Sequence, residues 1–205
     1  MLCLNAGFIN AAGFIAFDVL TTNVTGHAAL LAVNTISLHL REARMVALWL
    51  LLFLGGAFFS GWFISKVGRD KASAYTVPIL IIILVLVVVS FFGPSYDRSL
   101  REKELYAGSL LFSMGMQNAL VSMISGSVVR TTHLTGMFTD LGIDLSAAFL
   151  SLRDLNPLLK RRITLRLVII GFFLVGGMIG GLLFFADRLC GILYSGLYPA
   201  VHFVL

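Results

Sequence analysis

The chain has 205 residues, of which 59% are hydrophobic and 12% are charged, and its mean hydropathy is +0.97. This composition lies far from that of soluble domains and predicts an integral membrane protein. The formal net charge of +5 comes from basic residues in short turns between apolar runs, so it indicates membrane topology and not nucleic-acid binding. Cys3 and Cys190 lie in apolar segments, which argues against a disulfide framework or a thiolate metal site.

Apolar segments follow one another along the whole chain and leave no room for a soluble domain. A helix that spans a membrane needs about 20 mostly apolar residues. The pattern predicts eight apolar or semi-polar helices, at 2–20, 24–40, 45–65, 77–93, 105–129, 132–152, 163–186 and 189–204. The branched aliphatic run from Ile79 to Val89 is typical of a lipid-facing helix. The predicted fold class is an all-α polytopic transmembrane bundle, with one domain over residues 1–205.

The chain also contains an internal repeat. A polar stretch at 130–136, RTTHLTG, interrupts a long apolar run and has a near copy at 21–27, TTNVTGH. Upstream of these stretches lie two further matching segments, GFINA at 7–11 and GMQNA at 115–119. Such self-similarity is the sequence signature of a duplicated structural unit. We therefore interpret the chain as two homologous halves, 1–96 and 104–205, each with a broken helix at its Thr-Gly motif.

The distribution of Lys and Arg tests how many segments cross the membrane. Eight crossings place ten basic residues on one side and five on the other. If the segments 24–40 and 132–152 instead enter and leave on one face, the count becomes six against nine. The positive-inside rule thus favours four crossings in each half, with both termini cytoplasmic and the halves parallel. The alternative, three crossings in each half, makes the two halves inverted.

The Thr-Gly stretches are candidates to line a solute site. An unwound backbone is tolerated in hydrocarbon only where protein or a water-filled cavity satisfies its amides. The alternatives are short external turns that cap the next helix, and amides that join helices. The predicted substrate-binding side chains are polar groups in or just before the breaks: Asn10, Thr22, Asn23, Thr25, His27, Gln117, Asn118, Arg130, Thr132, His133 and Thr135.

Two carboxylates follow the second break on one helix face, because Asp140 and Asp144 are four residues apart. A charged side chain at the bilayer centre costs about 2.5 to 3.5 kcal/mol on insertion scales, so such groups usually face a bundle interior or water. The functional interpretation is a proton or cation relay. The alternative is a buried structural interaction, with Arg130 or a polar residue of the other half as partner. No metal or cofactor is predicted, because His27 and His133 lack metal-ligand spacing.

Small residues recur four positions apart in the segments 45–65 and 163–186, as at Gly56 and Ser60 and at Gly176 and Gly180. This spacing lets helices approach to backbone contact. We expect these two segments to pack closely on each other.

Together, the segments at 6–10, 23–27, 115–119 and 130–136 resemble the YoaK-like family of bacterial inner-membrane proteins. The resemblance covers nearly the whole chain and implies a bacterial cytoplasmic-membrane location. It gives no substrate, because the family has no known function. Its members are usually described with about six spans, a count from which hydropathy omits the polar segments 24–40 and 132–152.

The leading functional hypothesis is a secondary transporter or permease for a small polar solute, which binds between the two breaks and is coupled to protons through Asp140 and Asp144. The alternative is a non-transporting membrane module that binds a lipid or a protein partner. An intramembrane enzyme is weaker, because no nucleophile or metal accompanies the two carboxylates, and we predict no enzyme. The expected partners are membrane lipids and the solute, without nucleic acid, and a homo-oligomer is compatible with the sequence.

Overall fold

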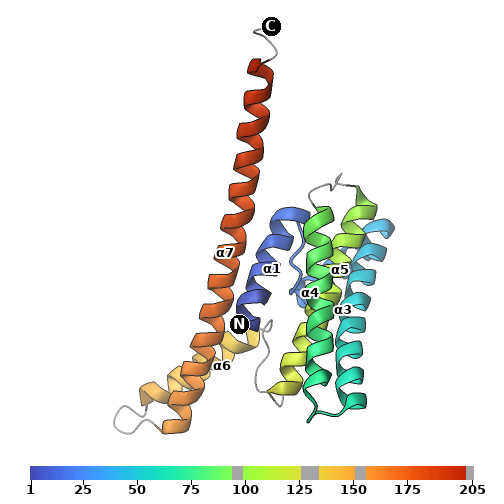
Figure 1. The fold of residues 1–205 in the computed structure, drawn as a ribbon. Helices are drawn as coiled ribbons and strands as arrows, with labels where there is room; N and C mark the ends of the chain where they lie inside the picture. The colour runs from blue at the N-terminus through green and yellow to red at the C-terminus, as the bar shows by residue number, and fades with distance from the viewer. Residues whose placement is uncertain (94–98, 126–133, 151–155, 202–205) are drawn as a thin grey trace.

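The computed structural model describes residues 1–93, 99–125, 134–150 and 156–201, with the side chains of the last helix described as far as residue 184. This part of the chain is all-helical, which confirms the predicted class (Figure 1). The helices are α1 (Leu2–Phe17), α2 (Val24–Ile36), α3 (Leu40–Val67), α4 (Ala72–Phe92), α5 (Leu100–Ile124), α6 (Leu134–Leu150) and α7 (Pro157–Val201).

Four of the helices are long and apolar enough to cross a membrane, namely α3, α4, α5 and the part of α7 from Pro157 to Phe184. Among them α5 is the most interior, because 61% of the residues in its apolar 18-residue stretch are buried. In the corresponding stretch of α4 only 11% are buried. The prediction that Ile79 to Val89 faces lipid agrees with this difference, because Leu80 and Leu84 are more than half exposed. The structure therefore has the features of a helical membrane protein.

The helices form two packed groups. In the α3 group, α3 packs against α2, α4 and α5, and in the α7 group, α7 packs against α1 and α6 (Figure 1). Trp49, Leu111 and Met114 lie in the core of the α3 group, where α1 also contributes Ile9 and Phe17. The two groups meet where α1 lies along α5.

Helices α1 and α5 run in opposite directions. Gln117, near the end of α5, contacts Asn5 near the start of α1, whereas Leu110 lies beside Gly13 at the other end of α1. Figure 1 shows the same opposition, because α1 rises from the N-terminus while α5 descends. The favoured layout of four crossings in each half requires these two helices to be parallel. That layout is therefore wrong, while the internal repeat and its symmetry stay predictions.

The two connections that contain α2 and α6 account for this direction. A 13-residue helix such as α2 is about 20 Å long, well below the hydrocarbon thickness of about 30 Å. In Figure 1 the end of α1 and the start of α3 lie at the upper end of the bundle, and the end of α5 and the start of α7 lie at the lower end. The chain thus leaves and returns on the same side at both connections. The segments predicted as crossings at 24–40 and 132–152 therefore lie between helix ends on one side of the bundle (Figure 1).

The last two predicted segments also differ from the structure. The sequence predicts separate helices at 163–186 and 189–204, but the backbone of α7 continues as one helix from Pro157 to Val201. The charged residues Asp187 and Arg188, which suggested a boundary, do not end the helix because neither residue breaks helical geometry.

Candidate functional site

The first Thr-Gly break is a folded-back connection between α1 and α2. Helix α1 ends at Asp18, whose backbone adopts the left-handed conformation with φ 56°, and its N–H bonds to carbonyls of the last turn. After this residue the chain turns inward, because Val19 and Thr21 are almost completely buried. The new helix is capped by Asn23, whose side-chain oxygen accepts a hydrogen bond of 3.0 Å from the backbone N–H of Gly26. The cap is thus Asn23 and not a threonine hydroxyl.

Two predicted binding residues of the first half meet at this connection. The Oδ1 atom of Asn10 accepts hydrogen bonds from the backbone N–H of Thr22, at 3.1 Å, and from its hydroxyl, at 2.9 Å. Asn10 thus satisfies two Thr22 donors that the break would otherwise leave unpaired inside the bundle. Asn10 therefore fixes the position of the break against α1.

His27 attaches α2 to the α3 group. Its Nε2 atom lies 3.0 Å from the backbone carbonyl oxygen of Leu20, and its buried ring packs at 5.6 Å, edge to face, against Trp49. Because a carbonyl oxygen only accepts, Nε2 is the nitrogen that carries the proton. The indole of Trp49 in turn donates a long hydrogen bond of 3.4 Å to the carbonyl of Glu104. The contact orients α2 rather than presenting an open imidazole.

The boundary between the two helix groups carries polar contacts beside the apolar ones of Ile9 and Phe17. The side-chain amide of Asn5 donates a hydrogen bond of 2.6 Å to Oε1 of Gln117, and Nε2 of Gln117 donates one of 2.9 Å to the carbonyl oxygen of Leu2. Gln117 is fully buried. The next side chain on α5, Asn118, has a buried Oδ1 atom without a hydrogen-bond partner among the described residues. The α1–α5 contact thus combines satisfied amides with one unused buried acceptor.

Asn5 is the member of this set that the sequence prediction omitted. It precedes the repeated GFINA segment, and its counterpart in the second half is the hydroxyl residue Ser113, so the search for matching polar positions passed over it. Asn5 and Gln117 are also 112 residues apart in the sequence, so no local sequence pattern indicates that they form a pair.

Glycines allow two close helix crossings, one in each group. A Cβ atom on Gly56 of α3 would overlap the backbone of Phe112 on α5, and a Cβ atom on Gly115 would overlap the backbone of Phe53 in return. The approach is therefore close enough for backbone contact, as the spacing of small residues predicted.

The second crossing joins α1 to α7 in the same way. A Cβ atom on Gly7 would overlap the backbone of Phe173, and a Cβ atom on Gly176 would overlap the backbone of Leu4. The expected partners were wrong, because the segments 45–65 and 163–186 pack on α5 and α1 and not on each other. The physical reason is that the glycines of each crossing face glycines on the shorter partner.

The two predicted carboxylates of α6 bind arginines of α7. Asp144 is buried and contacts Nη2 of Arg162 at 2.7 Å and Nη1 of Arg166 through its second oxygen. Asp140 is 54% exposed and lies 3.2 Å from Nη2 of Arg166. This cluster holds two carboxylates and two guanidinium groups, so it is formally neutral. The partners differ from the sequence expectation, which named Arg130 or a polar residue of the other half.

The structure thus brings together only some of the predicted binding residues. Asn10 and Thr22 are bonded, Gln117 and Asn118 lie at the α1–α5 contact, and His27 lies against Trp49. Thr25 and Thr135 occupy equivalent places in the first turns of α2 and α6, and both are exposed. The predicted Arg130, Thr132 and His133 lie outside the described residues.

Comparison with known proteins places the chain in one family. Residues 1–204 match the family described as "Protein of unknown function (DUF1275)". Searches of the curated proteins and of the solved structures give no match. The family match agrees with the resemblance to YoaK-like membrane proteins and covers all but the last residue. The chain belongs to the DUF1275 family.

Proposed function

We propose that this protein is a secondary transporter built from two inverted homologous halves. The observation that carries the proposal is the antiparallel course of α1 and α5 together with the two equivalent glycine crossings. Inverted repeats that share a binding site at their interface are a common architecture of secondary transporters.

The equivalence of the crossings rests on residue numbers. Leu4 and Gly7 of α1 correspond to Phe112 and Gly115 of α5 at an offset of 108. The residues that they meet on α7 and α3 correspond at an offset of 120, as Gly176 does to Gly56. In each half the first helix thus packs on the third helix of the other half, an exchange that a duplicated unit explains.

The short helices support the same correspondence. His27 of α2 contacts Trp49 of α3, and the positions equivalent to these are Met137 of α6 and Ile169 of α7. Met137 and Ile169 belong to one buried cluster. Both short helices therefore pack on the third helix of their own half at matching positions.

We place the moving boundary at the α1–α5 contact. Each helix group is held internally by a close crossing, whereas the groups meet through the apolar contacts of Ile9 and Phe17 and the amide hydrogen bonds of Asn5 and Gln117. Rigid groups that rock against each other around a central site provide alternating access. In this proposal the amide hydrogen bonds at the boundary are exchanged for bonds to a solute, while the apolar contacts slide.

The solute site in this proposal lies along α1 and α5, near the two breaks. Asn10, Thr22, Gln117 and Asn118 supply donors and acceptors there, and a small polar solute would take up the buried oxygen of Asn118. The location is a bacterial cytoplasmic membrane, which the family resemblance supports. The predicted position of both termini on one side does not fit the continuous α7, because α1 starts beside α6 and α7 runs from that end of the molecule to Val201 at the other (Figure 1).

The test is transport by purified protein in liposomes. We would measure uptake of a panel of radiolabelled amino acids, amides, sugars and polyols, with and without a pH gradient. Gln117→Leu removes the amide that joins the two groups and should abolish uptake of any transported solute. Ser109→Ala is the matched control, because Ser109 lies on the exposed side of the same helix and bonds only to its own turn. Absence of uptake across the panel, or equal activity in both variants, would refute the proposal.

Proton coupling requires a separate variant. If Asp140 carries a coupled proton, Asp140→Asn should leave transport without pH dependence. If it only pairs with Arg166, the variant should keep the pH dependence of the native protein.

A further inference from the structure

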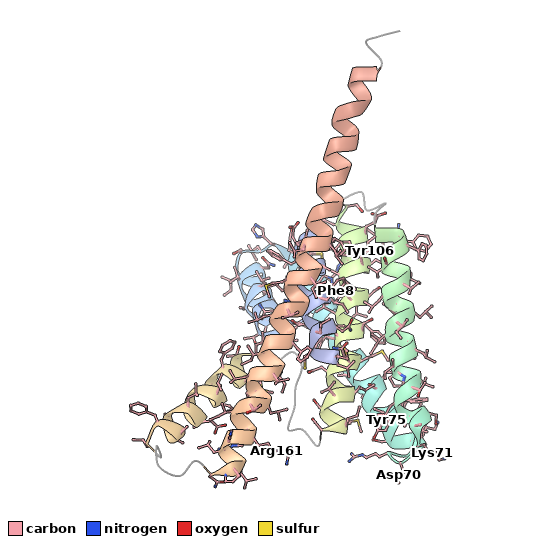
Figure 2. The ribbon with its side chains drawn as sticks, turned by 60° about the vertical axis from the view of Figure 1, so that its left-hand side comes forward. Phe8, Asp70, Lys71, Tyr75, Tyr106 and Arg161 are labelled. Atoms are coloured by element: carbon pink, nitrogen blue, oxygen red, sulfur yellow. The ribbon has the colours of Figure 1, made fainter. Side chains whose placement is uncertain are left out.

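Charge is distributed unequally between the two ends of the bundle. The end that holds the α3–α4 turn and the start of α7, here called the basic end, carries seven basic and three acidic described residues: Lys66, Arg69, Lys71, Lys160, Arg161, Arg162 and Arg166, and Asp70, Asp140 and Asp144. The opposite end carries four of each: Arg41, Arg44, Arg101 and Lys103, and Asp18, Glu42, Glu102 and Glu104. The described residues therefore give formal charges of +4 and zero. Figure 2 shows Asp70, Lys71 and Arg161 at the same end of the molecule.

Not all of the positive charge at the basic end is neutralised within the protein. Arg162 and Arg166 bind the carboxylates of α6. Lys160 and Arg161 are exposed, and within the described chain neither of them forms an ion pair. Two adjacent cations thus remain available to an external anion.

The position of these cations at a helix N-terminus also favours the binding of an anion. They lie in the first turns of α7, which begins at Pro157 and has no acidic residue in its first turn. The N-terminus of a helix carries partial positive charge, so a cation there is unfavourable and an anion is favourable.

The surroundings are those of a membrane interface. Leu158, just before the cations, is 68% exposed, and Leu165, one turn further along α7, is 40% exposed. On the other side of the basic end, the ammonium group of Lys66 lies 4.8 Å from the ring centre of Trp62, which is itself 48% exposed. Tryptophan beside a basic residue is typical of the headgroup region.

We propose that the basic end binds the headgroups of anionic phospholipids in the adjacent leaflet, with Lys160 and Arg161 as its principal contacts. A lipid satisfies both features of the surface, because its phosphate meets the cations while its chains cover the exposed leucines. Juxtamembrane clusters of basic residues bind anionic lipids through this combination. The proposal does not depend on transport, and it assigns the basic end to the cytoplasmic leaflet.

The experiment compares lipid binding by two double variants of the full-length protein. Lys160→Gln/Arg161→Gln removes the proposed contacts, and Arg101→Gln/Lys103→Gln removes two cations from the neutral end. Native mass spectrometry would measure the retention of phosphatidylglycerol against phosphatidylcholine, with thermal unfolding in phosphatidylcholine nanodiscs as the control for folding. Each cation near a membrane surface contributes about fivefold to binding, so the first variant should lose about 25-fold in phosphatidylglycerol retention. The second variant should lose little.

Three outcomes would overturn the proposal. One is native protein that retains both lipids equally, and another is an equal loss in the two variants. The third concerns the source of the phosphate. If inorganic phosphate at the same concentration displaces phosphatidylglycerol completely, the surface binds a soluble anion and not a lipid.

Discussion

The close crossing of α3 and α5 predicts a large difference between two neighbouring glycines. A Cβ atom on Gly56 would lie 2.9 Å from the carbonyl carbon of Phe112, whereas a Cβ atom on Gly55 would meet nothing within 4 Å. Favourable carbon–carbon contacts lie at about 3.5 to 4.0 Å. Gly56→Ala therefore forces the two helices apart by about 1 Å along the crossing, since the obstructing atoms belong to the backbone.

Gly55→Ala is the matched control for this prediction. Both substitutions gain about 0.8 to 1 kcal/mol of helix propensity, so this gain cancels when the two variants are compared. The remaining difference in stability is the cost of overpacking at Gly56, which is typically about 1 to 3 kcal/mol. We expect Gly56→Ala to be less stable than Gly55→Ala by that amount.

The assay is reversible unfolding in mixed micelles, with increasing dodecyl sulfate, followed by circular dichroism. The same comparison applies to the other crossing, where a Cβ atom on Gly176 would lie 2.7 Å from the carbonyl carbon of Leu4 and one on Gly171 would meet nothing within 4 Å. Equal stability of the two variants at either crossing would show that the helices do not approach as described, and the argument for paired crossings would fail.

Three further predictions concern helix attachment. Asp144→Asn should destabilise the attachment of α6 by about 1 to 3 kcal/mol, less than a fully buried pair, because Arg162 is 60% exposed, and hydrogen exchange of α6 measures the loss. Asp140→Asn should cost less than about 1 kcal/mol in the same assay, since this carboxylate is 54% exposed, and an equal cost would contradict the assignment of Asp144 as the main anchor. Asn23→Ala should lower the free energy of unfolding by about 1 kcal/mol while Asn23→Ser retains the cap, and identical melting of the two variants would exclude the capping role.

Local patterns in the sequence predicted the elements well. Apolar length predicted the long apolar helices, and the branched aliphatic run correctly indicated that α4 is the least buried of the four. These features depend on a few neighbouring residues, so they can be read from the sequence alone. The internal repeat stays a prediction.

The number of crossings could not be derived in this way. A short polar helix that returns to its starting side and one that crosses the membrane have the same amino-acid composition. Composition therefore does not distinguish them. The Lys and Arg count favoured the wrong layout because the basic start of α7 was assigned to the same side as Arg41 and Arg44. The two lie at opposite ends of the bundle, and only the direction of α5 relative to α1 separates them (Figure 1).

The ionic cluster was predictable in part. Asp140 and Asp144 were correctly placed on one helix face, but their partners were not identified. Arg162 and Arg166 have the same spacing of four residues on the next helix, and this match of two carboxylates with two guanidinium groups was the available signal. It was missed because both arginines were counted as topology signals in a basic turn.

Within the proposed repeat, the charge difference between the halves makes the two short helices unequal. Helix α2 is attached through His27 and Trp49, whereas α6 adds the pairs of Asp144 with Arg162 and Arg166 to its apolar contact. The positions equivalent to this acid and these bases in the first half are Asn34, Glu42 and Val46, which cannot form such pairs. The attachment of α6 therefore depends on ionic strength and that of α2 does not, because only charge pairs are screened by salt. In a carrier with alternating access, α2 would then close one side of the membrane through apolar packing, and α6 would close the other side through its ion pairs.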